Sequence, residues 1–215
     1  MNIVVILSGG NGTRFGDDTP KQYHFLANKE VIAYSIEASL RSDATNNTIV
    51  VAGIEYHERL MKTYSVQCVE SGSTRNISLK NSLDYIHAMF PSCEKIFINE
   101  AARPFINSNI VNDYFRYLDE YDAVITTQRI TDSLGRDDGA VIDRDEYFLI
   151  QAPEAFKFNV LYRYFSAESR ITATVQQLPI DRKVLKYYDF RNNLKITYKD
   201  DLLYAEQIMR LCNGN

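Results

Sequence analysis

The chain is poor in cysteine and histidine. Its three cysteines, Cys68, Cys93 and Cys212, are odd in number and widely spaced, and no histidine stands at a zinc-ligand spacing from them. We therefore expect neither a disulfide framework nor a structural zinc site. This cysteine usage fits a reducing compartment, so we expect a cytoplasmic protein.

Long apolar runs and an excess of basic charge are also missing. No apolar stretch approaches the ~18 residues of a membrane span, and "MNIVVIL" at the start lacks a basic lead and a small-residue cleavage site. Lys and Arg number 24 against 28 Asp and Glu, a formal net charge of −4. We therefore expect neither a membrane nor nucleic acid as a partner.

What is present indicates one globular domain over residues 1–215. Hydrophobic residues make up 45% of the chain and charged residues 24%, which is ordinary for a packed core. β-branched runs alternate with segments of helical spacing. The runs are 2–7, 47–53, 64–70, 95–99 and 122–127, and the helical segments are 31–40, 56–62, 77–89 and 110–118. This alternation predicts an α/β fold with a doubly wound, mostly parallel sheet.

The alternation breaks after residue 127. Two short β-like runs flank "GRDDGA", where Asp138-Gly139 is a hairpin signal. We expect an inserted β-arm at about 128–150. A helix at 159–168, a strand at 184–188 and a helix from Lys199 to about Leu211 should follow.

The stretch "ILSGGNGTRFGDDTPKQY" (6–23) directly follows the first buried run. Its glycines permit backbone N–H groups to approach phosphate oxygens, and Arg14 and Lys21 add positive charge from the same loop. Neither G-x-x-x-x-G-K-[ST] nor G-x-G-x-x-G fits it. A tight turn with both cations in solvent is the alternative left open by this loop alone.

Several motifs in order resemble the cytidylyltransferases that make CDP-alcohols, the methylerythritol-phosphate and ribitol-phosphate enzymes. Their signature, G-x-G-x-R followed by P-K-Q-[YF], corresponds to "GGNGTRFGDDTPKQY". "ESGSTRNISLKNSL", "FINEAARPFI", "ITDSLGR", "IDRDEYFLIQAPEAF" and "NNLKITYKDDLLYAE" resemble the later family motifs. The resemblance covers residues 3 to about 210 and implies a Rossmann-like nucleotidyltransferase fold.

The resemblance implies that CTP and a sugar-alcohol phosphate give a CDP-alcohol and pyrophosphate, with Mg²⁺. Bringing two polyanions together requires positioned cations, and Arg14, Lys21 and Lys195 are the expected catalytic residues. The expected CTP-binding residues are Ser8, Gly9, Gly10, Gly12, Gly72, Arg75 and Ser78. The expected acceptor-binding residues are Glu100, Arg103, Ser133, Arg144 and Thr172, with Glu100 also the expected metal ligand. In the family the arm packs into a second subunit, so a homodimer is implied.

The departures from the family pattern gather on the acceptor side. The family Asp, Thr and Gln become Glu100, Ser133 and Glu154, while Ala152 and Ala173 replace Thr and Asp. This pattern, with "LSGG" and "NNLKIT", favours an unusual alcohol phosphate and leans toward the ribitol-type branch.

Two other classes stay open at this point. A metal-dependent glycosyltransferase uses Asp-x-Asp, and "DRD" at 143–145 supplies the letters, although it lies in the expected arm. A protein that binds CTP but has lost activity is the other, prompted by Glu100 and Ala173.

Overall fold

The computed structural model describes residues 1–10 and 12–213. The strands are β1 Asn2–Leu7, β2 Phe25–Leu26, β3 Lys29–Glu30, β4 Asn47–Ala52, β5 Gln67–Glu70, β6 Lys95–Glu100, β7 Ala123–Arg129, β8 Phe148–Lys157 and β9 Val184–Tyr187. The helices are α1 Val31–Leu40, α2 Ile54–Tyr64, α3 Arg75–Met89, α4 Ser108–Tyr117, α5 Phe158–Tyr164 and α6 Asp200–Asn213, with 3-10 turns at Lys21–Tyr23, Arg144–Glu146 and Thr174–Gln177. Across the described ranges, no helix has the length and apolarity to cross a membrane.

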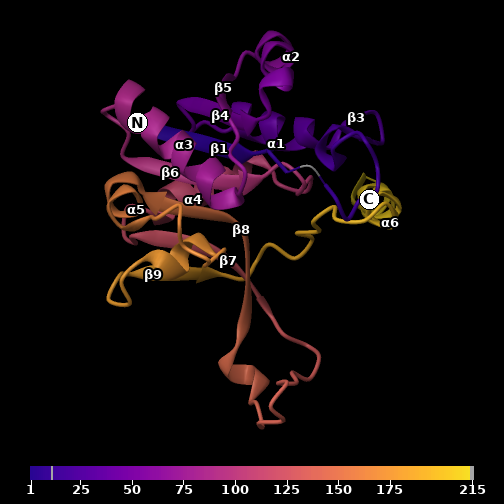
Figure 1. Cartoon of the computed structure of the whole chain (residues 1–215), viewed down its shortest axis with the longest axis vertical. Helices are drawn as coiled ribbons and strands as arrows, with labels where there is room; N and C mark the ends of the chain where they lie inside the picture. The colour runs from indigo at the N-terminus through magenta and orange to yellow at the C-terminus, as the bar shows by residue number, and fades with distance from the viewer. Residues whose placement is uncertain (11, 214–215) are drawn as a thin grey trace.

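One seven-stranded sheet runs through the molecule in the order β5-β4-β1-β6-β8-β7-β9 (Figure 1). β1 pairs in parallel with β4 and β6, and β4 with β5 and β7 with β9 are also parallel. Only β8 runs antiparallel to its neighbours β6 and β7. The predicted α/β class with a mostly parallel sheet is therefore confirmed.

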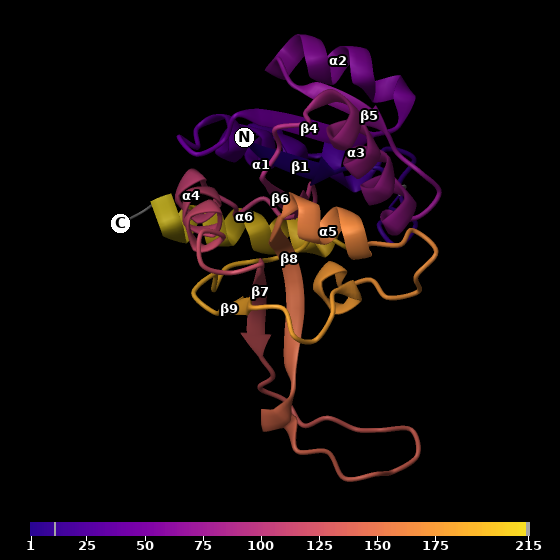
Figure 2. The same cartoon turned by 90° about the vertical axis from the view of Figure 1, so that its left-hand side faces the viewer.

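The alternation of side chains along the buried strands explains the layers. Val4 and Ile6 of β1 pack in a cluster with α1, α2 and α4, whereas Ile3 and Val5 pack with α3 and α5 on the other face. Successive strand side chains point to opposite faces, so an all-apolar strand needs cover on both sides. A smaller cluster seats α6 through Ala205 against Leu26 and Ile196. Figure 2 shows these helices around the sheet.

The strand order indicates where a ligand-binding cleft should lie, at the carboxyl ends of the interior strands. The chain leaves β1 for β4 on one side and later enters β6 on the other, so the order reverses at β1. In doubly wound sheets ligands bind at this reversal, beyond the carboxyl ends of the strands. The loops that follow β1 and β6 meet there.

An arm spans residues 130–147 between β7 and β8 and projects from the body (Figures 1 and 2). The predicted turn is present, since Gly139 has φ 76° and its N–H donates to the Arg136 carbonyl at 2.9 Å. Strand structure is confined to the base of the arm, so the prediction of β-like runs around the turn is wrong. The many charges of "GRDDGA" and the absence of a third paired strand leave these residues without a ladder.

Some predicted bounds also needed correction. The helix predicted to end at Glu168 ends at Tyr164, and β5 begins at Gln67 because α2 continues to Tyr64. The sequence predicts the β8 residues only as part of the arm, whereas β8 is an interior strand of the sheet. Its register shifts against β7 between Ile125 and Thr126, which accommodates Pro153. Pro lacks the N–H that a regular strand ladder needs, so a proline in the sequence argues against an interior strand. For this reason β8 could not be predicted from the sequence.

Candidate active site

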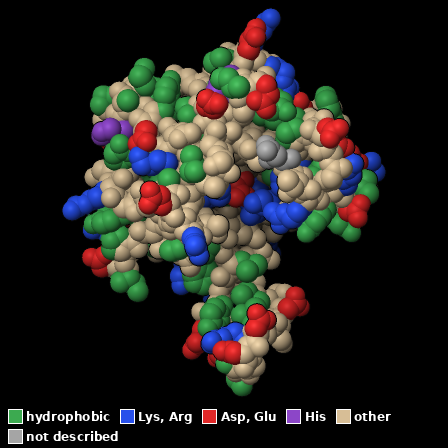
Figure 3. All heavy atoms as spheres, in the orientation of Figure 1, with side chains coloured by type: hydrophobic (Ala, Val, Ile, Leu, Met, Phe, Trp, Pro, Cys, Tyr) green, Lys and Arg blue, Asp and Glu red, His purple; other side chains and the backbone are tan. Residues whose placement is uncertain are grey.

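A cavity of about 540 Å³ opens at the carboxyl end of β1. Figure 3 shows Lys and Arg side chains gathered at a hollow in this face, with acidic side chains among them. The lining comes from the β1 loop, the turn before α3, the end of β6 and the stretch before α6. Its residues are Leu7, Ser8, Gly9, Gly10, Lys21, Gln22, Ser71, Gly72, Ser73, Thr74, Arg75, Ser78, Glu100, Ala101, Ala102 and Lys195. Most of the predicted CTP-binding set is therefore assembled in one place.

Close backbone approach explains two of the glycines. A Cβ on Gly9 would lie 2.3 Å from the Cβ of Ser71, and one on Gly72 would lie 2.1 Å from Cγ2 of Ile77. Gly10 differs, because a Cβ there would meet nothing within 4 Å. Gly12 has φ 62° and belongs to a turn in which its carbonyl accepts from the Phe15 N–H.

Gly9→Ala and Gly10→Ala form a matched pair of substitutions. We expect Gly9→Ala to lower the free energy of unfolding by about 1–3 kcal/mol, because the backbone must move away from Ser71. Gly10→Ala should leave unfolding unchanged and raise the KM for CTP, since its methyl group enters open space beside the cavity. Urea unfolding and steady-state kinetics separate the two effects. Equal loss of stability in both variants would contradict this assignment.

Gln22 supports the loop from beneath and was missed as a site residue. Its side-chain amide donates to the carbonyls of Ser8 at 2.6 Å and Gly10 at 3.1 Å, and it is buried. Tyr23 beside it accepts a hydrogen bond from the Ser8 hydroxyl at 3.2 Å. The sequence signal for both residues was "PKQY", in which Gln22 and Tyr23 directly follow Lys21.

The turn before α3 forms the opposite wall. Thr74 caps the helix by accepting from the Ile77 N–H at 3.1 Å. The Ser78 hydroxyl accepts from the Gly72 N–H at 3.0 Å and donates to the Gly72 carbonyl at 3.3 Å. Ser78 therefore holds the glycine turn as well as lining the cavity.

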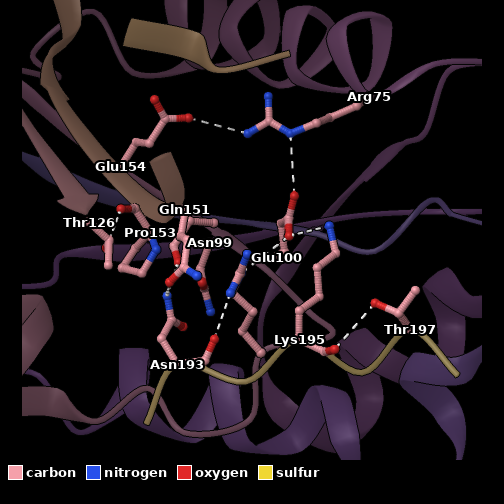
Figure 4. A network of polar contacts seen from close by, with 12 residues as sticks. Arg75, Asn99, Glu100, Thr126, Gln151, Pro153, Glu154, Asn193, Lys195 and Thr197 are labelled. Carbon is pink, nitrogen blue, oxygen red and sulfur yellow. Dashed lines mark hydrogen bonds and ion pairs between the residues drawn. The ribbon is translucent and has the colours of Figure 1, made fainter. Parts of the chain in front are cut away.

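Glu100 is the centre of the charged network (Figure 4). Its carboxylate lies 2.7 Å from Nζ of Lys195, 3.4 Å from Nε of Arg103 and 3.6 Å from Nε of Arg75. Burial alone would raise the pKa of Glu100, but the charges of Lys195 and Arg103 outweigh it and lower the pKa to about 2. The carboxylate is thus ionised and orients three cations.

A second cavity of about 330 Å³ lies beyond this network. It shares Arg75, Glu100 and Lys195 with the first, so the two cavities meet at these side chains. The remaining lining residues are Arg103, Ile150, Gln151, Ala152, Glu154, Thr172 and Ala173. Arg103 and Thr172, both predicted to bind the acceptor, are therefore together.

Asn193 holds three residues that line the second cavity and was also missed. It is buried, and its amide donates to the Gln151 side chain at 2.9 Å and the Ala152 carbonyl at 2.7 Å. Its carbonyl accepts from Nη1 of Arg103 at 2.7 Å. The stretch before Lys195 thereby fixes Arg103 as well as the bulged part of β8.

Lys21 carries a perturbed charge. Burial lowers the pKa of Lys21 to about 8, and the positive charges of Lys195 and Arg14 act in the same direction. Arg14 itself has an exposed side chain on the turn after β1. Arg14 lines neither cavity, whereas Lys21, Arg75 and Lys195 line the first one together with one carboxylate, Glu100. The first cavity therefore has an excess of positive charge, as a binding site for a polyanion requires.

The Lys21 pKa predicts a pH profile. Lys21 is cationic below about pH 8 in the free protein and neutral above it, so kcat/KM for CTP should fall up to tenfold per pH unit on the alkaline side. Bound triphosphate favours the charged form, so the same limb in kcat should lie at higher pH. Lys21→Arg should remove the limb, because a guanidinium stays charged. A limb that persists in Lys21→Arg would contradict the assignment.

The structure does not bring every predicted residue to this site. Ser133 and Arg144 are exposed on the arm and line neither cavity of their own chain. Arg144 donates to the Thr131 carbonyl and lies 3.8 Å from Asp145. Asp143 accepts from the Asp145 N–H, so "DRD" forms a local turn on the arm. That position gives the glycosyltransferase alternative no support.

Comparison with known proteins extends these observations. A curated 2-C-methyl-D-erythritol 4-phosphate cytidylyltransferase of Thermosipho melanesiensis is 27% identical over 94% of this chain and 95% of its own. One from Caldicellulosiruptor bescii is 30% identical over 95% and 96%. The solved 4-diphosphocytidyl-2C-methyl-D-erythritol synthase of Anaerococcus prevotii superposes with a TM-score of 0.80 at 21% identity, covering 97% of this chain and 98% of that one.

The fold and the relatives define a CTP-dependent nucleotidyltransferase. More narrowly, the family model described as IspD, 2-C-methyl-D-erythritol 4-phosphate cytidylyltransferase, matches residues 2–211, and the chain belongs to that family. The expected leaning toward the ribitol-type branch gains no support from these relatives.

Proposed function

We propose that the chain transfers CMP from CTP to 2-C-methyl-D-erythritol 4-phosphate and releases pyrophosphate. The observation that carries this proposal is the pair of cavities that share Arg75, Glu100 and Lys195. The glycine-walled cavity suits CTP, and the second suits an acceptor phosphate beside Arg103. The names of the relatives support the choice of acceptor.

The reaction forms one bond and breaks one. An oxygen of the acceptor phosphate attacks the α-phosphorus of CTP, and the bond from that phosphorus to the β-phosphate oxygen breaks. The acceptor phosphate is already an anion, so no general base is needed. Lys21 and Arg14 neutralise charge on the triphosphate and the leaving pyrophosphate, while Lys195 faces the α-phosphate.

Mg²⁺ is part of the proposed reaction, and the described residues offer it few ligands. They contain no group of three His, Cys, Asp or Glu that could hold a metal ion. Glu100 is the only carboxylate lining the first cavity, and it already contacts three cations. Mg²⁺ commonly takes one carboxylate together with substrate phosphates. Glu100 would therefore be the protein ligand of an ion that enters with CTP, and such an ion would supply positive charge to the phosphates.

The arm supports a homodimer in this proposal. Ser133 and Arg144 lie outside both cavities of their own chain, on an arm that projects from the body (Figure 2). A guanidinium suits bidentate phosphate binding. We propose that Arg144 and Ser133 complete the acceptor site of a second copy.

Pyrophosphate release with CTP, Mg²⁺ and a panel of alcohol phosphates tests the proposed function. Methylerythritol 4-phosphate should support turnover with a higher kcat/KM than ribitol 5-phosphate. Turnover with ribitol 5-phosphate alone would reinstate the ribitol-type reading. CTP binding in calorimetry without turnover on any acceptor would indicate a protein that binds CTP and has lost activity.

A further inference from the structure

One buried carboxylate has no part in the proposed reaction. Glu154 lies on β8 at the bulge, 2% exposed, and lines the second cavity. An ionised carboxylate buried without partners is strongly unfavourable. Its partners therefore show what it does.

Glu154 holds the backbone of the segment before Gln176. Its Oε1 accepts from the Thr174 N–H at 3.1 Å, and its Oε2 accepts from the Val175 N–H at 2.9 Å. Oε1 also lies 3.5 Å from Nη2 of Arg75. Burial raises the pKa of Glu154, while Arg75 and the two backbone N–H groups oppose the rise, so its charge depends on these partners.

Arg75 makes the rest of the connection. Its Nη1 donates to the Thr172 carbonyl at 3.0 Å and to the Thr174 hydroxyl at 3.1 Å. Its Nε faces Glu100 at 3.6 Å. Figure 4 shows the guanidinium between Glu154 and Glu100, one on each side. The segment 172–175 supplies Thr172 and Ala173 to the wall of the second cavity. Its hydrogen bonds to Arg75 tie it to one of the three residues that both cavities share.

We propose that Glu154 is a positioning residue that determines how the acceptor is bound. It fixes the segment 172–175 and the guanidinium of Arg75 in one arrangement, and so sets the shape of the second cavity. This inference rests on the proposed function, in which that cavity holds the acceptor. A glutamine at position 154 would keep the size of the side chain, but its NH₂ group is a donor. That donor would face another donor, either a backbone N–H of Thr174 or Val175 or the guanidinium of Arg75, and the segment 172–175 would lose its fixed position.

Glu154→Gln should raise the KM for methylerythritol 4-phosphate by about tenfold, because buried donors lose their acceptor. The calorimetric Kd for CTP should stay within about twofold, since Glu100 still holds Arg75. Asp122→Asn is the matched control. Asp122 also contacts a cation, Lys157 at 3.2 Å, and a backbone N–H, that of Lys183 at 3.3 Å, but it lines neither cavity. Asp122→Asn should leave both the KM for the acceptor and the Kd for CTP unchanged.

An unchanged acceptor KM in Glu154→Gln, or a fall in kcat alone, would overturn the proposal. Should Glu154→Gln fail to fold, Thr174→Val removes the hydroxyl that accepts from Arg75 but keeps the backbone N–H that donates to Glu154, and it should raise the same KM less. An unchanged acceptor KM in Thr174→Val would then count equally against it.

A second readout separates this inference from the proposed function. If wild type turns over no acceptor in the panel, the proposed function fails. Hydrogen exchange then tests the role of Glu154. The amides of 171–178 should exchange faster in Glu154→Gln than in wild type, and at the wild-type rate in Asp122→Asn. Unaltered exchange in Glu154→Gln would overturn it.

Discussion

Replacing Lys21 by alanine is expected to lower kcat for pyrophosphate release by about 10²–10³-fold, the usual cost of losing one group that stabilises transition-state charge. Lys21 lines the first cavity with Arg14 and Lys195 nearby, and the Glu100 carboxylate contacts Lys195. Fold stability should not fall, because a half-buried cation among other cations is removed. The measurement is steady-state kinetics with thermal unfolding as the check on folding.

Two outcomes would count against this role. Unchanged turnover in Lys21→Ala would remove the proposed mechanism. A rise in the KM for CTP with kcat unaltered would restrict Lys21 to binding. Lys62→Ala is a suitable control, since this exposed lysine lies on α2, away from both cavities.

Arg144→Ala is expected to lower kcat/KM for the acceptor by roughly 10- to 100-fold, the effect of losing hydrogen bonds to a charged group. The loss should occur although Arg144 lines no cavity of its own chain. We expect this loss because, in the proposed homodimer, the Arg144 guanidinium completes the acceptor site of the second copy.

Mixing two impaired variants, measured at an acceptor concentration well below KM, tests whether the arm completes the site of the second copy. In a dimer of Lys21→Ala with Arg144→Ala, the chain with intact Lys21 receives an intact arm, so one site works. Random mixing should restore about one quarter of wild-type activity. Arg144→Ala mixed with the double variant Lys21→Ala/Arg144→Ala offers no intact arm and should restore none. No recovery in the first mixture would show that the arm is not shared.

The sequence was most informative where function depends on local order. The glycine loop and Lys21 could be singled out because they directly follow the first buried run, and Lys195 because its motif resembles that of the family. Gly9, Gly10, Lys21 and Lys195 line one cavity in the fold, while their roles stay a prediction. Close approach to Ser71 and Ile77 gives physical reasons for Gly9 and Gly72. The sheet class followed from buried β-branched runs.

The acceptor side was less predictable because its geometry is non-local. β8 contains Pro153 and lacks alternation, so its place in the interior of the sheet depends on pairing with β6 and β7. In the sequence, Glu154 is only a charged residue in place of the family Gln, whereas the fold buries it against Arg75. Asn193 and Gln22 act through backbone carbonyls that only the folded chain brings near them.

A competition reaction tests the central claim most directly. The protein is given CTP, Mg²⁺ and equal concentrations of methylerythritol 4-phosphate and ribitol 5-phosphate, and the products are resolved by mass. The account predicts CDP-methylerythritol as the main product, formed one for one with pyrophosphate. CDP-ribitol as the main product, or CMP and pyrophosphate without a CDP-alcohol, would contradict it.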